Sequence, residues 1–137
     1  MKTHNDLSDK VFEEQFANCQ LDAVIFSHEA HLRLAWIHIR KYGIDQAIEN
    51  ICTQLKAYTQ SLGAIEKYNE TVTTAAINAV YHFMLKSNTD TFQIFTIEHP
   101  RLISNFRDLL GQHYAIDIFH SELAKSTFLE PELLPFD

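Results

Sequence analysis

The stretch from Phe26 to Gly43, F-S-H-E-A-H-L-R-L-A-W-I-H-I-R-K-Y-G, constrains the fold more than any other part of the chain. Ser27 can accept a hydrogen bond from an unpaired backbone N–H group of a first helical turn. Gly43 can adopt the left-handed conformation that often follows a last turn. Acidic Glu29 near the start and basic residues near the end suit the helix dipole. The sequence therefore predicts a helix from about His28 to Tyr42.

The polar face of this predicted helix is narrow. At about 100° per residue, Glu29, Arg33 and Arg40 fall on one side, with Lys41 at its edge. A stripe this narrow indicates a helix that its neighbours cover on two sides, so we expect it to lie at the centre of a bundle. The rest of its surface is formed by Leu32, Leu34, Ala35, Trp36, Ile37, Ile39 and Tyr42, with His28, His31 and His38 within or beside this apolar arc.

Helical periodicity recurs along the remaining chain. Apolar residues repeat at spacings of three and four, and the three glycines and three prolines are fewer than a β-sandwich or barrel needs. A length of 137 residues fits one domain. The sequence predicts an all-α fold, a single-domain compact helical bundle covering residues 1–137, with about five to seven helices and an extended C-terminal tail. Helices are expected at about 9–18, 28–42, 45–61, 70–86, 90–98, 100–110 and 117–126.

Local signals refine this picture. Residues 1 to about 7 are polar and are expected to be loose. Asp45 is predicted to cap the next helix, and the short link at Gly43 predicts that this helix packs antiparallel to the central one. Residues 21–26 are interpreted as a packed link and not as a strand, because no second strand is available to pair. The tail, T-F-L-E-P-E-L-L-P-F-D, is expected to lie extended against the bundle or to dock on another subunit.

Two histidines are candidates for a functional site. His28 and His31 are three residues apart, so both side chains can point toward one spot from adjacent turns. Imidazole is a common ligand for zinc and iron. The segment H-E-A-H lacks the four-residue spacing of the zinc-protease signature H-E-x-x-H. The alternative interpretation is structural, with His28 partly solvated and His31 hydrogen-bonded in the core.

The start of the predicted helix after Asn69 supplies candidate partners for this pair. Asn69 can act as an N-cap, Glu70 favours the first turn, and Thr73 lies at the same end. If three consecutive helices alternate in direction, this start lies near His28 and His31. The candidate ligand-binding residues are then His28, His31, Asn69, Glu70 and Thr73. The candidate ligands of a divalent transition metal are His28, His31 and Glu70.

Both stretches resemble a pattern found in a group of short, uncharacterised, all-helical bacterial proteins. Residues 26–36 fit F-[ST]-H-x-x-H-L-x-x-A-W, and residues 67–73, K-Y-N-E-T-V-T, fit K-[YF]-H-E-T-[IV]-T at six of seven positions. The departure is Asn69, where the group has histidine. A third histidine there would complete a three-histidine metal site with Glu70 beside it, whereas asparagine is a poor ligand for transition metals. The resemblance implies no established activity.

Charge and composition exclude several function classes. A net charge of −7 argues against nonspecific binding to nucleic acid or anionic membranes. The sequence has no glycine-rich nucleotide loop and no G-x-S-x-G elbow. For a ferritin-like di-iron site, which needs two E-x-x-H pairs, Glu66-x-x-Asn69 has the spacing but ends in asparagine, and no full second pair is present. It also lacks an apolar signal core and any apolar run of membrane-spanning length. We therefore expect a cytoplasmic protein in which Cys19 and Cys52 are reduced.

Two functional hypotheses remain. The first, which we favour, is a noncatalytic small-ligand or protein-binding module, a candidate homodimer, in which the histidines and Glu70 tie helices together and the tail docks on a partner. The second is a metal-dependent enzyme or metal-binding protein. In that case Glu70 is a ligand or general base, and Asn69 and Thr73 orient a small substrate. The sequence assigns no catalytic residue and no substrate.

Overall fold

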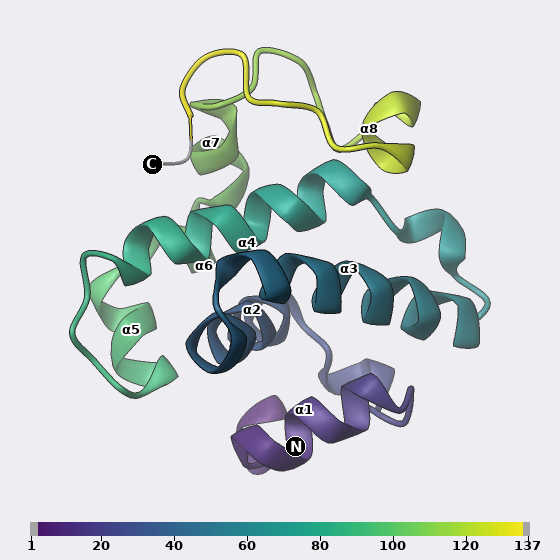
Figure 1. The fold of residues 1–137 in the computed structure, drawn as a ribbon, viewed down its shortest axis with the longest axis vertical. Coiled ribbons are helices and arrows are strands. Elements are labelled where there is room, and N and C mark those ends of the chain that lie inside the picture. Colours follow the sequence, from purple (N-terminus) through teal and green to yellow (C-terminus); the bar gives the residue numbers. More distant parts are fainter. Residues whose placement is uncertain (1–2, 136–137) are drawn as a thin grey trace. The chain divides into compact units, whose positions relative to one another are not determined.

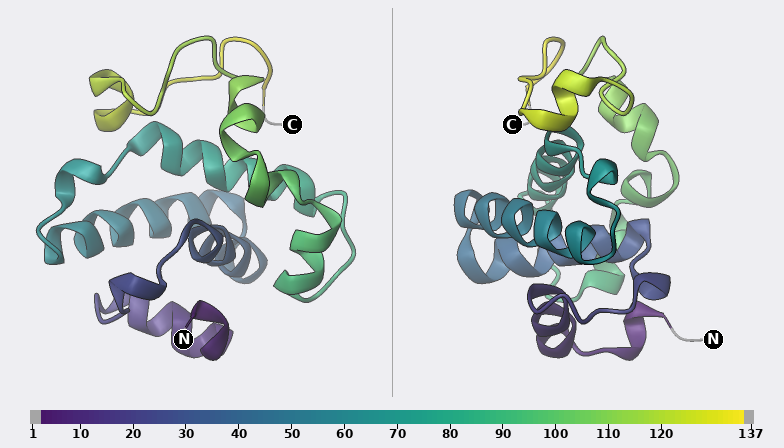
Figure 2. Two further views of the ribbon diagram at one scale, coloured as in Figure 1. Left: turned by 180° about the vertical axis from the view of Figure 1, so that it is seen from behind. Right: turned by 90° about the vertical axis from the view of Figure 1, so that its right-hand side faces the viewer.

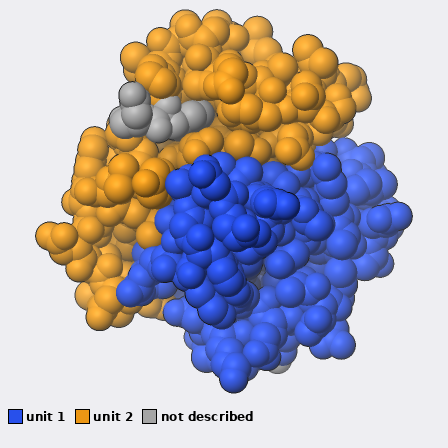
Figure 3. Space-filling view, viewed as in Figure 1, with its two compact units in different colours: residues 1–68 blue, residues 69–137 orange. Residues whose placement is uncertain are grey.

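The computed structural model describes residues 3–135, and every regular element in that range is helical (Figure 1). This confirms the predicted all-α fold. The contacts divide the chain into two compact units, residues 1–68 and residues 69–137 (Figure 3). The prediction of a single domain stays a prediction. None of the helices within residues 3–135 has both the length and the apolar character required to span a bilayer.

The first unit is built around α2, as the sequence predicts. The hydroxyl of Ser27 accepts a hydrogen bond from the backbone N–H of Ala30 at 3.2 Å, and α2 ends at Gly43, whose φ is +86°. Every residue from 32 to 39 is buried, including Arg33. The elements of this unit are η1 (His4–Asp6), α1 (Asp9–Ala17), η2 (Ala23–Ile25), α2 (His28–Tyr42), α3 (Ile44–Ser61) and η3 (Ile65–Lys67).

The helices α2 and α3 meet at a corner. Figure 1 looks along the axis of α2, whereas α3 lies across the view, and Figure 2 shows the same crossing from behind. The predicted antiparallel packing is therefore wrong. The reason is Gly43, which ends α2 and starts α3 with φ +86° and ψ 166°, a conformation open only to glycine. Because α3 already begins at Ile44, Asp45 lies inside its first turn and is not the predicted cap.

Aromatic side chains hold the link between α1 and α2. The ring of Phe16 lies 5.0 Å from the rings of both Phe26 and Tyr58, measured between centroids. The hydroxyl of Tyr58 donates to the carbonyl of Leu21 at 2.9 Å. These contacts confirm that residues 21–26 form a packed link, with a single 3₁₀ turn and no strand.

Over residues 69–135 the second unit contains five α-helices, because one predicted helix is divided. The predicted segment 100–110 breaks at Asn105, where φ is −131° and ψ is 39°. Just before the break, the hydroxyl of Ser104 donates to the carbonyl of Pro100 at 3.0 Å, a bond that competes with regular helix geometry. The final helix begins at residue 122 and not near 117. The bounds are α4 (Glu70–Met84), α5 (Phe92–Glu98), α6 (Arg101–Ser104), α7 (Phe106–Gly111) and α8 (Glu122–Ser126).

A hydrophobic core joins α4, α7 and α8 within this unit. Helix α8 packs beside the start of α4, and the tail runs from α8 back toward α7 (Figures 1 and 2). The buried core residues are Ala75, Leu110, Tyr114, Ile118 and Ala124, with Val72, Phe106, Phe119 and Leu129 packed against them. The predicted extended tail therefore lies against its own unit over the described residues.

Helices α1 and α3 end in the same hydrogen-bond pattern, the Schellman motif. The residue after the C-cap is left-handed in both, but it is Gly63 in one case, with φ +69°, and Cys19 in the other, with φ +58°. A side chain is strained in this conformation, whereas glycine is not. The bonds are Gln20 N to Gln15 O (2.8 Å) and Cys19 N to Phe16 O (3.1 Å) after α1, and Ala64 N to Thr59 O (2.8 Å) and Gly63 N to Gln60 O (3.0 Å) after α3.

We expect Cys19→Gly to raise the free energy of unfolding by up to about 1 kcal/mol, because relief of left-handed strain exceeds the added entropy of the unfolded chain. At the matching position, Gly63→Ala should lower it by about 1 kcal/mol. Urea denaturation followed by circular dichroism measures both changes. A Cys19→Gly variant less stable than the parent would show that packing of the thiol outweighs the backbone strain.

Candidate functional site

The predicted site residues lie at the starts of two helices. His28 and His31 occupy the first turn of α2, in the first unit, while Glu70 and Thr73 follow the cap Asn69 at the start of α4, in the second. Their predicted convergence joins residues of both units and stays a prediction. Within residues 3–135, no group of three or more His, Cys, Asp and Glu side chains is arranged to hold a metal ion.

The imidazole of His31 is neutral at physiological pH. Its ring lies edge-on to Phe26, with 3.9 Å between the centroids. Although His31 is open to solvent on one side, the protein atoms around the ring remove much of its hydration. This desolvation lowers the pKa of His31 to about 4, and the nearby His28 contributes in the same direction. A neutral imidazole has a free lone pair for a ligand or a hydrogen-bond donor.

Both polar groups of the Asn69 side chain are used within the second unit. Its Oδ1 accepts a hydrogen bond from the backbone N–H of Val72 at 2.9 Å, which confirms the predicted N-cap. Its Nδ2 donates to the carbonyl of Ile118 at 2.8 Å. The residue that departs from the histidine of the resembled pattern thus ties the start of α4 to the segment before α8.

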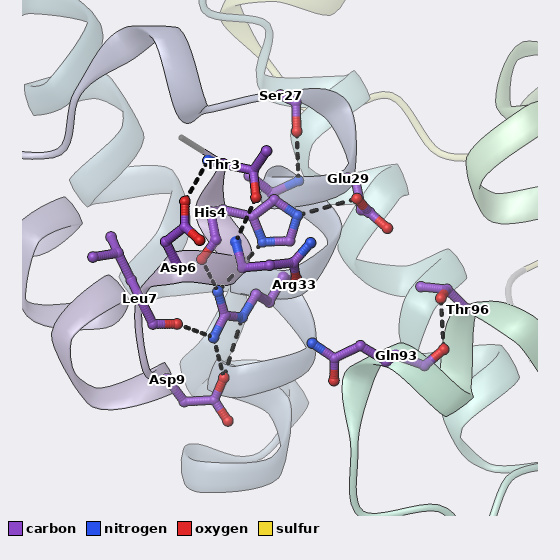
Figure 4. Close-up of polar contacts among 12 residues, drawn as sticks. Thr3, His4, Asp6, Leu7, Asp9, Ser27, Glu29, Arg33, Gln93 and Thr96 are labelled. Carbon is purple, nitrogen blue, oxygen red and sulfur yellow. Dashed lines mark hydrogen bonds and ion pairs between the residues drawn. The ribbon is translucent and has the colours of Figure 1, made fainter. Parts of the chain in front are cut away.

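Arg33, which periodicity places on a polar stripe, is buried with 4% of its surface exposed. Its guanidinium donates to the carbonyls of His4 at 2.6 Å and Leu7 at 2.8 Å (Figure 4). It also donates to Oδ1 of Asp9, from Nε at 3.1 Å and from Nη2 at 2.7 Å. The guanidinium carbon lies 4.9 Å from the centroid of Phe12. We call Arg33 with His4, Leu7 and Asp9 the Arg33 clasp.

The N-terminal segment is ordered by this clasp. His4 is buried, with Nε2 3.1 Å from Oε2 of Glu29 and Nδ1 3.3 Å from Nη1 of Arg33. Thr3 and Asp6 form a capping box around η1. The predicted looseness is therefore wrong for residues 3–7, and residues 1–2 lie outside the described residues. The T-x-x-D spacing was the sequence signal that could have indicated an ordered turn.

A second polar cluster joins α1 to the end of α2. The hydroxyl of Tyr42 donates to Oε2 of Glu13 at 2.6 Å, and Nζ of Lys41 donates to Oε1 at 2.9 Å. Burial raises the pKa of Glu13, but these two hydrogen bonds, together with the charges of His38 and Lys41, outweigh the effect of burial, and the net shift is downward. The buried ring of His38 lies 5.3 Å from that of Tyr42, and burial lowers the pKa of His38. His38 is thus a core residue, as the periodicity indicates.

The hydroxyl of Thr71 binds the backbone of the C-terminal tail. Thr71 is fully buried in α4, and its Oγ1 donates to the carbonyl of Thr127 at 2.7 Å while accepting from the N–H of Leu129 at 3.0 Å. The hydroxyl of Tyr114 donates to the carbonyl of Leu129 at 2.8 Å. Burial, together with nearby acidic residues, raises the pKa of Tyr114 to about 12, so this phenol remains a donor at physiological pH.

The tail makes further backbone contacts beside α7. The N–H of Leu133 donates to the carbonyl of His113 at 3.0 Å, and Nδ1 of His113 lies 2.8 Å from the carbonyl of Leu134. The N–H of Ala115 donates to Oε1 of Glu132. We call the surface formed by Thr71, His113 and Tyr114 the tail groove, because all three contact the tail backbone.

Comparison of the chain with protein-family models, curated proteins and solved structures found no match. The resemblance of its two motifs to short bacterial proteins stays a prediction. The chemistry of the side chains is therefore the basis for inferring the function.

The tail groove was missed by the sequence predictions. Hydrophobic periodicity assigns a residue to a face of a helix but does not identify its partner, and Thr71 lies 56 residues from Thr127. One signal was available: Thr71 is part of the K-Y-N-E-T-V-T motif, beside the predicted site residues.

Replacing Arg33 with lysine should lower the free energy of unfolding by about 3 kcal/mol. An ammonium group cannot reach two carbonyls and a carboxylate at once, so buried acceptors lose their partners. Arg40→Lys, at an exposed position of the same helix, is the matched control and should change stability by less than about 0.5 kcal/mol. Urea denaturation measures both, and amide hydrogen exchange in residues 4–8 should accelerate only in Arg33→Lys. Equal stability of the two variants would contradict the clasp.

Proposed function

We propose that this chain is a noncatalytic protein-binding module whose tail groove binds an extended peptide segment. The observation that carries the proposal is the Thr71 hydroxyl, which pairs with a backbone carbonyl and a backbone N–H of the same segment. Side chains that bind the backbone of an extended segment hold it through groups that every residue has, while side-chain pockets supply selectivity. In the structure, the extended segment bound to Thr71 is the chain's own C-terminal tail.

The apolar part of the groove defines the preferred segment. Leu129 packs against the core cluster that includes Ala75, Leu110 and Ile118. Pro131 follows two residues later and favours an extended backbone without an N–H donor. The groove therefore suits an extended segment with one large apolar anchor and a proline close behind it.

A second copy of the chain is the simplest partner. Thr127 leaves α8 in an extended conformation, with φ −146° and ψ 152°. The same segment from another copy would offer the groove the same carbonyls and N–H groups, which leads to a homodimer by tail exchange. A tethered segment has an effective concentration of millimolar order, so the chain's own tail competes strongly with any partner.

The test uses a fluorescent peptide of residues 126–137 and the full-length chain. Leu129→Ser in the chain should weaken the chain's own tail and raise its affinity for the wild-type peptide at least tenfold, measured by fluorescence anisotropy. The peptide carrying the same Leu129→Ser change should bind neither chain. Thr71→Val, added to the Leu129→Ser chain, should weaken peptide binding, because valine keeps the shape and loses both hydrogen bonds.

Leu123→Ser is the matched control for this experiment. Leu123 lies on α8 with 61% of its surface exposed, so its replacement should leave peptide affinity unchanged. Circular dichroism verifies that each variant is folded. A folded Leu129→Ser chain that binds the wild-type peptide no better than the parent does would contradict the proposed function.

Metal binding is the alternative function, and the observation that favours it is the position of two imidazoles at the start of α2, the second of which is His31. His28 lies three residues earlier on the same helix, a spacing at which two imidazoles can share one ion. Catalytic zinc sites have three protein ligands, and Glu70 is the predicted third. A metal-dependent reaction would require that such an ion binds.

If the histidine pair binds a metal, untagged protein reconstituted with zinc, iron or manganese should retain close to one equivalent by plasma mass spectrometry. The double variant His28→Ala/His31→Ala should lose it while remaining folded, because imidazole nitrogens supply the ligand bonds. His120→Ala, an exposed position in the second unit, is the control and should retain the metal. Glu70→Gln tests the predicted third ligand separately. Wild-type protein that stays metal-free after reconstitution would exclude this alternative.

A further inference from the structure

A pocket of about 220 Å³ opens in the second unit beside the turn that precedes α8. Leu110, Tyr114 and Ile118 form apolar walls, and all three are buried members of the core. No tail residue up to position 135, where the described part of the chain ends, lines the pocket. The pocket therefore differs from the tail groove, although Tyr114 contributes to both and Leu110 and Ile118 belong to the core cluster against which Leu129 packs.

Arg107 is a cationic residue that lines this pocket. The guanidinium carbon of Arg107 lies over the ring of Phe119, 4.0 Å from its centroid, which is a cation–π contact. Arg107 is exposed, and among residues 3–135 its guanidinium has no hydrogen-bond or ion-pair partner. Its N–H groups are thus free for a ligand.

Asp117, the acidic residue that lines the pocket, makes its hydrogen bonds to Phe119 and His120. Asp117 Oδ1 accepts a hydrogen bond from the N–H of Phe119 at 3.0 Å, and Oδ2 lies 2.6 Å from Nδ1 of His120. The His120 hydrogen bond, with smaller contributions from Phe119 and the charge of Arg107, holds the pKa of Asp117 below its usual range. Both Asp117 oxygens are engaged by its own turn, so neither is bonded to Arg107.

We propose that this pocket binds a small carboxylate with a compact apolar body. The carboxylate would pair with the Arg107 guanidinium, whose fork matches a carboxylate in a bidentate pair. The apolar body would lie against Leu110, Tyr114 and Ile118. An apolar cavity of about 150 Å³ accepts benzene, so the pocket has room for one aromatic ring with a short acid side chain. A phosphate is a poorer fit, because Asp117 adds negative charge beside a single arginine.

The probe is phenylacetate, titrated into the full-length chain and followed by two-dimensional NMR and calorimetry. Binding should saturate and shift the amide signals of residues 107–119. Arg107→Gln should weaken it about tenfold or more, because a charge-assisted hydrogen-bond pair is lost. Arg107→Lys should retain part of the affinity. Arg101→Gln, an exposed arginine that does not line the pocket, should leave the affinity unchanged.

Phenylacetamide, neutral and of the same shape, separates charge recognition from burial of the ring. It should bind the wild-type chain at least tenfold more weakly than phenylacetate, and Arg107→Gln should bind both compounds alike. Equal affinity of the wild-type chain for the two compounds would overturn the proposal, as would unchanged phenylacetate affinity in Arg107→Gln. The absence of shifts at millimolar phenylacetate would overturn it as well. None of these outcomes depends on the tail-peptide experiment.

Discussion

Every helix leaves its first backbone N–H groups without partners inside the helix, and five of the described α-helices meet that constraint with a short polar side chain, whereas α3, α6 and α7 have no side-chain cap. These caps set the first residue of a helix through hydrogen bonds to neighbouring residues. Long-range contacts then join helices whose first residues are already defined. At Asn69 one side chain does both, since it caps α4 and also binds the carbonyl of Ile118. The other side-chain caps of α-helices are Ser8, Ser27, Thr91 and Ser121.

These local rules explain which features could be predicted from the sequence. Helix α2 begins and ends as Ser27 and Gly43 indicate, α4 begins after the Asn69 cap, and His28 and His31 share one turn. The direction of α3 could not be predicted, because it depends on the backbone angles that Gly43 adopts. The burial of Arg33 could not be predicted either, since periodicity does not tell whether water or a distant segment covers a polar stripe. The same limit hid the tail groove and the pocket at Arg107.

The two ends of the described chain are held by different chemistry. The Arg33 clasp contains a buried guanidinium, and removing its partners leaves a charge without compensation, which is strongly unfavourable. Thr71 is neutral, so exchange of one backbone segment for another at its hydroxyl would carry little electrostatic cost. The N-terminal segment is therefore suited to permanent closure, whereas the tail is suited to exchange. This difference is why we place partner binding at the tail groove and not at the clasp.

The sequence separation of these contacts has a consequence for folding during synthesis. The hydrogen bonds of the Arg33 clasp span at most 29 residues, and the Tyr58 to Leu21 bond spans 37. In the second unit, the hydrogen bonds that join the start of α4 to the segments around α8 include Asn69 to Ile118 and Thr71 to Leu129, which span 49 and 58 residues. Contacts of long span form slowly, and domains fold as their residues leave the ribosome. The first unit can thus complete its long-range contacts earlier in synthesis than the second, in which the hydroxyls of Thr71 and Tyr114 bond to residues of the C-terminal tail.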